Sequence, residues 1–429
     1  MHVGRLDRPG RFEAGTSSIV EGHTGSVLDF DFNPFDDNMF ASASEDCSIK
    51  LWSIPDGNDW EPTDVNGRAK KGDNLTENLV DLLGHRKKVT LLRFHPTAAN
   101  VLASTSADYT VKVWDVESGE AISTTPKDSF GDNLISDVVW DARGEILATS
   151  CKDKNVRFMD PRAGAFHSTI TKAHEGLKSV KLAYLGDTGK ILTTGTSRQR
   201  EVKIWDLKNL SKPLLVENID TASGALLPLF DTDSNILYLC GKGDGIIRPY
   251  EFEDKAPYLH KLNDGFRSTV PAKGLCLVPK RGCNVMECET ARILKVTNND
   301  GIHPLSWVVP RKSDAFQDDI FPDCVSGVPA HGAEEWTGGS CKDPKRMSLD
   351  PKVNGGVGVG FGGGAGGNGG GAGAGAGGNG GAGGGRMKLK TVASVSKELK
   401  EAKERILYLE KKLQDCGIDI GDVDGDVDI

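Results

Sequence analysis

Two segments near the start of the chain superpose on each other without a gap. One runs from Gly22 to Trp52 and the other from Gly84 to Asp115. In both, a histidine precedes a serine, an aspartate and a tryptophan at the same three intervals. Runs of alternating apolar and polar residues lie between these positions, which is typical of half-buried β-strands. One such unit cannot bury its faces alone, so the pattern predicts several β-sheets packed side by side.

The residues shared by the two segments indicate a buried polar relay. The histidine can donate to the aspartate of the turn and accept from the serine of the strand, whose neighbour is the indole N–H. This set is typical of the WD40 repeat. Because it recurs together with a tryptophan, we favour this structural role over hydrolase chemistry and predict no catalytic residue. The residues are His23, Ser44, Asp46 and Trp52 in the first unit, and His85, Ser106, Asp108 and Trp114 in the second.

Weaker versions of the same unit continue along the chain at residues 138–160, 174–206 and 226–252. Further strand-like runs, at residues 274–278, 291–296 and 305–309, lack the signature. The sequence thus predicts an all-β fold with five recognisable blades and a degenerate sixth. Repeats of this kind close radially into a β-propeller.

The C-terminal part changes composition abruptly. Residues 354–386 are almost only Gly, Ala and Asn, which predicts a flexible linker because such a stretch has little to bury. Residues 387–416 have the composition of a helix. Residues 417–429 form an acidic tail, in which a calcium-loop spacing lacks the closing glutamate.

The helical segment carries an apolar seam in steps of three and four residues, which predicts an α-helical coiled coil. A narrow seam favours self-association over docking of a lone amphipathic helix. Arg405 and Glu410 fit the Arg-x-x-x-Leu-Glu motif of short trimeric coiled coils, so we expect a parallel homotrimer. The residues expected to hold the oligomer are Val392, Val395, Leu399, Ala402, Arg405, Ile406, Leu409, Glu410 and Leu413.

Charge and cysteine usage limit the function further. The formal net charge of −9 gives no global attraction for nucleic acid. The sequence has neither a transmembrane run nor a signal peptide, and nine scattered cysteines point to reduced thiols in the cytoplasm. Cys283 and Cys288 lack a second ligand pair, so we predict neither a metal site nor a cofactor.

Stretches in the second half resemble the coronin family in detail. They include LCGKGDGIIRPYE at 239–251, LVPKRGCNVMECETAR at 277–292, VPRKSDAFQDDIFPD at 309–323 and EEWTGGS at 334–340. This resemblance implies a seven-bladed propeller over residues 1–310 and an extension over 311–353 that packs on it. It also implies F-actin binding at the cell cortex, with the Arp2/3 complex and cofilin as further partners.

One departure from the family lies at the N-terminus. Coronins carry about one further blade before the Gly22–His23 repeat, and only residues 4–8 and the strand toward Val20 resemble its end. Most of the first blade is therefore missing from this sequence. We favour a gene model that starts late over an altered closure of the ring.

Actin is acidic, so basic loops are the candidate contacts with a filament. A different function remains open: a WD40 scaffold in vesicle or phagosome trafficking that does not bind actin directly, because the fold alone does not choose between these roles. The candidate actin contacts are Arg86, Lys87, Lys88, Lys152, Lys154, Lys280 and Arg281.

Overall fold

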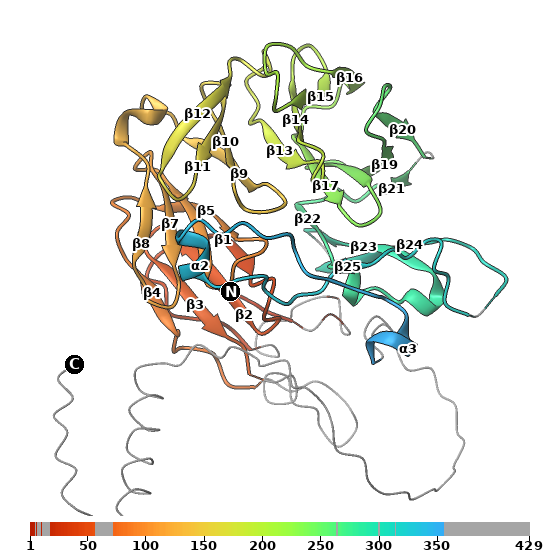
Figure 1. The fold of residues 1–429 in the computed structure, drawn as a ribbon, viewed down its shortest axis with the longest axis horizontal. Helices are drawn as coiled ribbons and strands as arrows, with labels where there is room; N and C mark the ends of the chain where they lie inside the picture. Colours follow the sequence, from red (N-terminus) through yellow and green to blue (C-terminus); the bar gives the residue numbers. More distant parts are fainter. Residues whose placement is uncertain are drawn as a thin grey trace, which may run out of the picture. The chain divides into compact units, whose positions relative to one another are not determined.

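The described strands β1 to β24 come in six consecutive groups along the chain (Figure 1). The computed structural model describes residues 1–4, 6, 10, 18–55, 72–262, 265–298, 301–313 and 315–355, all within one compact unit of the chain. The predicted coiled coil, the acidic tail and nearly all of the glycine-rich linker lie outside the described residues.

Within each group the strands pair antiparallel with their neighbours in the chain, except that the last strand of the fifth group pairs with the third. The first three sheets contain β1 (Val27–Phe32), β2 (Met39–Ser44), β3 (Ile49–Ser53) and β4 (Val80–Leu82); β5 (Val89–Phe94), β6 (Val101–Ser106), β7 (Val111–Asp115) and β8 (Ala121–Thr124); and β9 (Ile135–Trp140), β10 (Leu147–Cys151), β11 (Val156–Asp160) and β12 (Ala165–Ile170). The next three contain β13 (Lys181–Tyr184), β14 (Lys190–Thr196), β15 (Arg200–Asp206) and β16 (Leu215–Asp220); β17 (Leu226–Asp231), β18 (Ile236–Gly241), β19 (Ile246–Phe252), β20 (Leu259–Lys261) and β21 (Phe266–Arg267); and β22 (Gly274–Leu277), β23 (Glu289–Val296) and β24 (Ile302–Val308).

Short elements complete the described chain. The strands β25 and β26 pair with each other in the C-terminal extension; one short helix lies between them in the chain and another follows them. Among the described residues, no helix has the length and apolar character needed to cross a bilayer. The short elements are η1 (Lys127–Phe130), η2 (Lys280–Gly282), η3 (Val285–Glu287), β25 (Cys324–Val325), α2 (Ala333–Thr337), β26 (Arg346–Met347) and α3 (Pro351–Asn354).

Each of the six sheets is one blade of a propeller. The first strand of every sheet packs against the first strand of the next, from β1 through β5, β9, β13 and β17 to β22, so these strands are the innermost ones. The described residues thus form six blades, which confirms the prediction of five recognisable repeats and a degenerate sixth. The resemblance implies seven blades for the family, and the described part of this chain supplies six.

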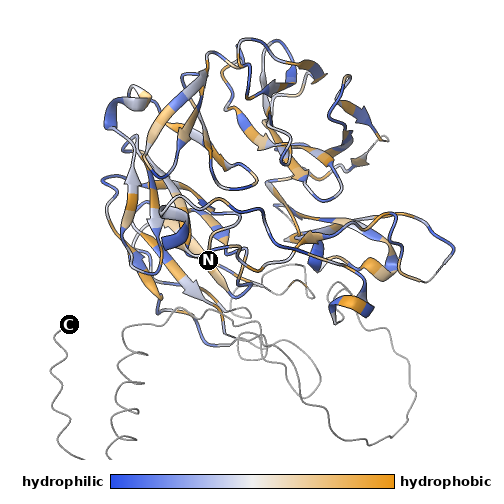
Figure 2. Ribbon diagram, in the orientation of Figure 1, coloured by the Kyte–Doolittle hydropathy of each residue, from blue (hydrophilic) through white to orange (hydrophobic). Residues whose placement is uncertain are grey.

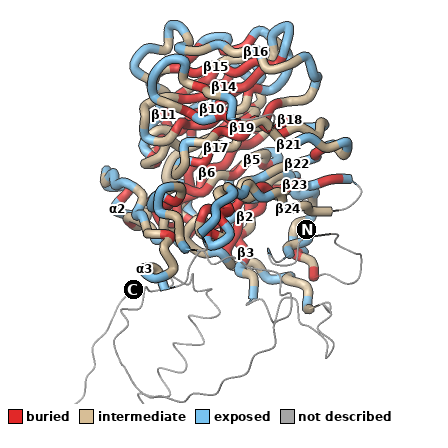
Figure 3. The backbone as a smooth tube through the Cα atoms, turned by 90° about the vertical axis from the view of Figure 1, so that its right-hand side faces the viewer, coloured by how far each residue is buried: buried red, intermediate tan, exposed pale blue. Residues whose placement is uncertain are grey.

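The core lies between the blades. Every residue of β2, β6 and β10 is buried, and Figure 3 shows the buried segments running along the central strands while the connections are exposed. Apolar residues concentrate in the same strands (Figure 2). The outer strand β12 alternates between exposed and partly buried residues, as expected for a strand with one solvated face.

Charged side chains link neighbouring blades near the centre. The Asp29 carboxylate accepts from the backbone N–H of Leu92 at 2.9 Å and pairs with the Arg93 guanidinium at 3.2 Å, which ties the first blade to the second. Asp137 likewise accepts from Leu182 N–H at 2.9 Å and joins the third blade to the fourth. Such links satisfy polar groups that would otherwise be buried without partners.

The connections of the blades gather on two opposite faces. In an antiparallel meander, the turns between second and third strands lie at the same end as the links between blades. We call this end the turn face. The other connections lie at the opposite end, which we call the extension face because residues 311–353 contact it. There the N–H of Ala330 donates to the Thr97 carbonyl at 2.8 Å, and Arg346 pairs with Asp233 at 3.1 Å.

Candidate protein-binding surface

A polar relay supports the turn face in the first blade. His23 Nδ1 lies 2.9 Å from the Asp46 carboxylate, and its Nε2 lies 2.7 Å from Ser42 Oγ. The Trp52 indole N–H donates to the same hydroxyl at 2.8 Å. Because the carboxylate can only accept, His23 donates through Nδ1 and accepts from the serine through Nε2. The histidine is thus held between the turn and the strand.

The second blade repeats this relay almost without change. His85 lies 3.0 Å from Asp108 and 2.7 Å from Ser104, and Trp114 donates to Ser104 at 2.8 Å. The predicted histidines, aspartates and tryptophans are therefore brought together in both units.

The predicted serines of the relay are wrong by two residues. Trp52 lies opposite Phe40 in the paired strands β3 and β2. Ser44 is four residues beyond Phe40, which places it roughly 13 Å along the strand from Trp52 at about 3.3 Å per residue. Ser42 is only half as far from Trp52 along the same face of β2, and its hydroxyl accepts the indole hydrogen bond. Ser44 instead accepts from the N–H of Asp46 at 3.2 Å, and Ser106 plays the same turn-capping role at Asp108, at 3.1 Å.

A third relay lies in the fourth blade, with different residue types. His174 contacts Glu201 at 2.8 Å and Thr193 at 2.8 Å, and the Trp205 indole donates to Thr193 at 3.0 Å. The range 174–206 was predicted as a blade from its sequence, but Thr193 and Glu201 were not recognised as relay residues, because threonine replaces serine and glutamate replaces aspartate. The signal that could have found Thr193 is the separation of 19 residues between histidine and hydroxyl, which all three relays share.

Burial keeps His174 neutral. Desolvation lowers its pKa to about 4, although the hydrogen bond to Glu201 acts in the opposite direction. Gly195 in β14 makes room for the ring, since a Cβ there would lie 2.3 Å from His174 Cγ. The base of the loop between β12 and β13 is therefore fixed by a neutral, buried contact at ordinary pH.

Three segments of the turn face come together above this histidine: residues 152–155, 171–179 and 197–199. The N–H of Ala173 donates to the Lys154 carbonyl at 2.9 Å, and the Lys154 ammonium donates to the Glu175 carbonyl at 2.6 Å. The N–H of Gly176 donates to the Thr196 carbonyl at 2.5 Å, beside the third segment. We call the cations on these segments the blade 3–4 patch. They are Lys152, Lys154, Lys172, Lys178 and Arg198.

The blade 3–4 patch carries an excess of positive charge. Two acidic residues share the same segments, Asp153 and Glu175, and Asp153 is paired with Arg157 from β11 at 2.5 Å. Among the described residues, none places a carboxylate within ion-pair distance of Lys152, Lys178 or Arg198, and all three are exposed. Uncompensated surface cations of this kind attract an acidic partner.

The other basic run of the turn face, Arg86 to Lys88, lies in the link between the first two blades. All three of its residues are exposed. Lys88 lies 3.6 Å from Glu45, and the Lys87 ammonium stacks 5.1 Å from the centre of the Tyr109 ring. This run is therefore accessible but partly engaged with its neighbours.

Lys280 and Arg281 lie elsewhere, and the prediction that Lys280 could contact actin is wrong. Lys280 is only 8% exposed, and its ammonium donates to the Asp231 carboxylate and the Thr290 carbonyl, which joins the fifth blade to the sixth. Arg281 lies on the extension face, where it pairs with Asp37 of the first blade at 2.6 Å. Both cations connect blades, at the end of the propeller opposite to the other candidates.

The extension face is covered at the second and third blades by helix α2. Its Trp336 is fully buried, and the indole N–H donates to the Gly144 carbonyl at 3.2 Å. The Arg162 guanidinium lies over the indole at 4.7 Å and donates to the Trp336 carbonyl at 2.7 Å. His95 packs edge-on against the same indole, with ring centres 4.9 Å apart.

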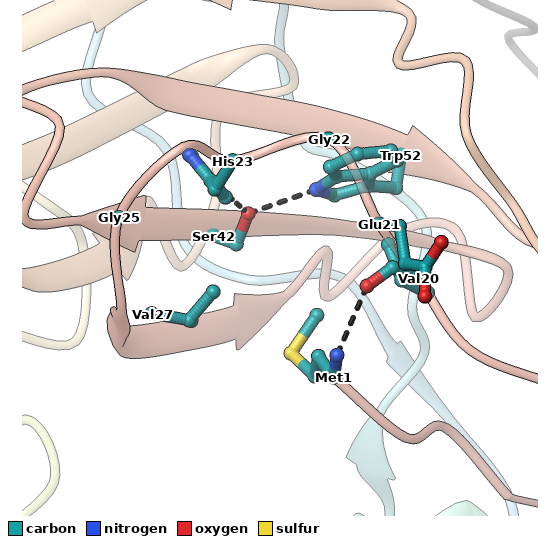
Figure 4. Close-up of a pocket in the computed structure, with 9 residues that line it drawn as sticks. All are labelled: Met1, Val20, Glu21, Gly22, His23, Gly25, Val27, Ser42 and Trp52. Atoms are coloured by element: carbon teal, nitrogen blue, oxygen red, sulfur yellow. Dashed lines mark hydrogen bonds between the residues drawn. The ribbon is translucent and has the colours of Figure 1, made fainter.

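A cavity of about 470 Å³ opens beside the first blade. Figure 4 shows Met1 and Val20 on one side of it and the relay of His23, Ser42 and Trp52 on the other. In the same blade, Phe30 and Phe32 of β1 are about half exposed. The relay atoms already have partners, so the cavity offers few polar groups for a ligand.

Comparison with known proteins agrees with this architecture. A profile described as "WD domain, G-beta repeat" matches residues 16–53 and 77–115, and one described as "Type of WD40 repeat" matches residues 302–344. The chain is 41% identical to human Coronin-2A over 337 residues, which cover 77% of this chain and 61% of the relative. It is 40% identical to Coronin-like protein crn1 of Schizosaccharomyces pombe, and the match covers 77% of this chain and 53% of that relative.

A solved structure extends the comparison to three dimensions. The crystal structure of the WD40 domain from Toxoplasma gondii coronin superposes with a TM-score of 0.70 at 32% identity, and the match covers 77% of this chain and 82% of that one. The chain spans about three fifths of the length of the human relative and about half of the yeast one. On the strength of its repeats, its sequence relatives and this shared fold, the chain belongs to the coronin family.

Proposed function

We propose that this protein binds F-actin and regulates the organisation and turnover of actin filaments. Family membership supports the proposal, and the exposed cations of the turn face supply a physical basis for it. The observation that carries it is the blade 3–4 patch, where Lys152, Lys178 and Arg198 have no carboxylate partner among the described residues although the whole chain is acidic. An acidic filament would be attracted to this face and repelled elsewhere.

Oligomerisation would strengthen a modest contact. Each propeller engages one filament subunit, and the helical segment at 387–416 gathers three propellers as a parallel trimer. Tethering makes the second and third contacts intramolecular, which can raise the overall affinity by roughly 10²–10⁴ without any new contact. Side-binding and bundling of filaments follow from this arrangement, with action at the cell cortex alongside the Arp2/3 complex and cofilin.

Co-sedimentation of the full chain with F-actin tests the proposal. We expect the protein to pellet with filaments at low salt and to be released as salt rises, because screening shortens the range of surface charges to about 8 Å at physiological ionic strength. If the protein does not pellet with filaments at low salt, the proposed function is wrong. The trafficking scaffold would then be the better account.

A matched pair of seam variants separates the propeller from the oligomer. Leu409→Asp places a charge in the seam, whereas Leu407→Asp places it on an outer position of the same helix. We expect Leu409→Asp to abolish the trimer in sedimentation equilibrium and to weaken filament binding by at least about tenfold. We expect Leu407→Asp to leave both unchanged. A wild-type monomer at tens of micromolar would contradict the trimer.

A further inference from the structure

Leu177 is the most solvent-exposed large apolar residue of the described chain, at 96% exposure. It lies in the link between β12 and β13, one of the three segments that carry the blade 3–4 patch. Single exposed leucines are common on protein surfaces, so exposure alone has little meaning. The support of the loop and the charges around it distinguish this residue from the others.

The loop that carries Leu177 is fixed immediately before the leucine. Upstream, His174 is buried in its relay with Thr193 and Glu201. One residue before Leu177, Gly176 passes so close to the end of β14 that a Cβ would lie 2.1 Å from Thr196 Oγ1. The preceding carbonyl, of Glu175, accepts from the Lys154 ammonium at 2.6 Å. The leucine is therefore displayed by a braced loop, so little conformational entropy remains to be lost on binding.

Exposed cations lie on the three segments that meet at this loop. Lys178 follows the leucine directly, Lys152 comes from the β10–β11 turn, and Arg198 comes from the β14–β15 turn. An apolar centre with a polar rim is the anatomy of a protein-binding surface, in which the centre is desolvated and the rim sets orientation and encounter rate. A nucleic acid would use the cations but gain little from a leucine at this position.

We propose that Leu177 is the apolar anchor of the filament contact, inserted into an apolar depression that acidic side chains surround on the partner protein. This inference rests on the proposed function and specifies which part of the turn face makes the contact. The cations steer the acidic surface toward the patch, and burial of the leucine then slows dissociation. The affinity for the filament should therefore have two separable contributions, the attraction by the cations and the burial of Leu177. Only the attraction by the cations should weaken as salt rises.

Two leucines on the same face provide a matched test with the full chain. Leu177→Ser removes the proposed anchor, and Leu83→Ser changes a leucine that is 69% exposed in the link between β4 and β5. We expect Leu177→Ser to weaken F-actin binding by at least about tenfold in co-sedimentation, with the same relative loss at low and high salt. Leu83→Ser should bind as the wild type does. Both side chains are exposed, so the midpoints of thermal unfolding should stay the same.

The outcomes separate this inference from the proposed function. If the wild type binds filaments and Leu177→Ser binds within about twofold of it, the anchor is wrong while filament binding stands. If the wild type does not bind filaments, both proposals are wrong. If Leu177→Ser loses binding to phosphatidylserine vesicles but keeps binding to filaments, the leucine anchors a membrane contact instead, and the inference is overturned.

Discussion

On the turn face, the charged ends of Lys152, Lys178 and Arg198 extend into solvent, whereas on the extension face Arg143 and Arg346 contact carboxylates. Arg143 lies 2.9 Å from Asp187 and Arg346 lies 3.1 Å from Asp233. Exposed pairs of this kind add little stability, but they neutralise the surface that carries them. The net charge of the chain therefore conceals a local difference: carboxylates neutralise these two arginines, whereas the three cations of the blade 3–4 patch remain available to a partner.

The C-terminal extension explains part of this difference. Residues 326–346 run across the extension face and bring Trp336, His331 and Arg346 into contact with connections of the second, third and fifth blades. No described segment crosses the blade 3–4 patch in the same way. If this division is correct, damage to the extension face should lower stability, and damage to the turn face should lower binding.

The largest effect on stability should come from Trp336→Ala. The indole is fully buried against the second and third blades, so its removal should lower the free energy of unfolding by about 3–5 kcal/mol. Guanidinium unfolding measures the loss, and Val328→Ala, at a half-exposed site on the extension, is the control that should change little. At a temperature where the variant stays folded, its binding to filaments should equal that of the wild type. A loss below about 1 kcal/mol would mean that the extension is not an integral part of the propeller.

Acidification should weaken the same region. Burial lowers the pKa of His95 to about 3, whereas an exposed histidine titrates near 6.5. Because the folded state holds this histidine neutral and the unfolded state protonates it, stability is complete above pH 6.5 and falls as the pH decreases below that value. Between pH 7 and pH 5 the expected loss from His95 is about 2 kcal/mol.

Unfolding measured at both pH values, with two histidine variants, checks this assignment. His95→Gln should flatten the pH dependence, although not completely, because burial also lowers the pKa of His174, to about 4. His167→Gln, at an exposed residue of β12, should leave the pH dependence unchanged. An unchanged slope in His95→Gln would show that another group controls acid sensitivity.

The smallest effect should come from Arg281→Ala. Its guanidinium contacts Asp37, whose carboxylate is largely exposed, so the pair should contribute no more than about 1 kcal/mol. Filament binding should not change, because Arg281 lies on the extension face. A large loss of binding with normal thermal unfolding would place part of the contact at this end of the propeller and would remove the distinction between the two faces.

The repeats were enough to predict the blades, because histidine, aspartate and tryptophan recur at fixed intervals in the first two and strand-like runs continue in the others. They did not predict which serine of each strand takes part in the relay. Ser42 and Ser44 lie on the same face of one strand, and only the register against β3 decides which of them Trp52 can reach. The relay of the fourth blade was harder still to predict, because Thr193 and Glu201 make the same hydrogen bonds as the serine and aspartate of the other blades.

The candidate surface was predictable only in part. Lys280 and Lys152 look alike in the sequence, because each lies in a short basic run near a turn. What separates them is the fold: Asp231, 49 residues before Lys280, contacts its ammonium, whereas Lys152 meets no carboxylate within the described residues. Leu177 was not singled out at all, since an apolar residue between strands gives no sign in the sequence of whether it is buried or displayed.

The turn face, and not the extension face, should bind the acidic filament. Two double charge reversals of equal net charge test it: Lys152→Glu with Lys178→Glu on the blade 3–4 patch, and Lys208→Glu with Lys212→Glu at exposed lysines of the β15–β16 loop on the extension face. In co-sedimentation of the full chain with F-actin at low salt, we expect the first variant to bind at least about tenfold more weakly and the second to bind within about twofold of the wild type. Equal losses in both variants, or a larger loss in the second, would contradict the account.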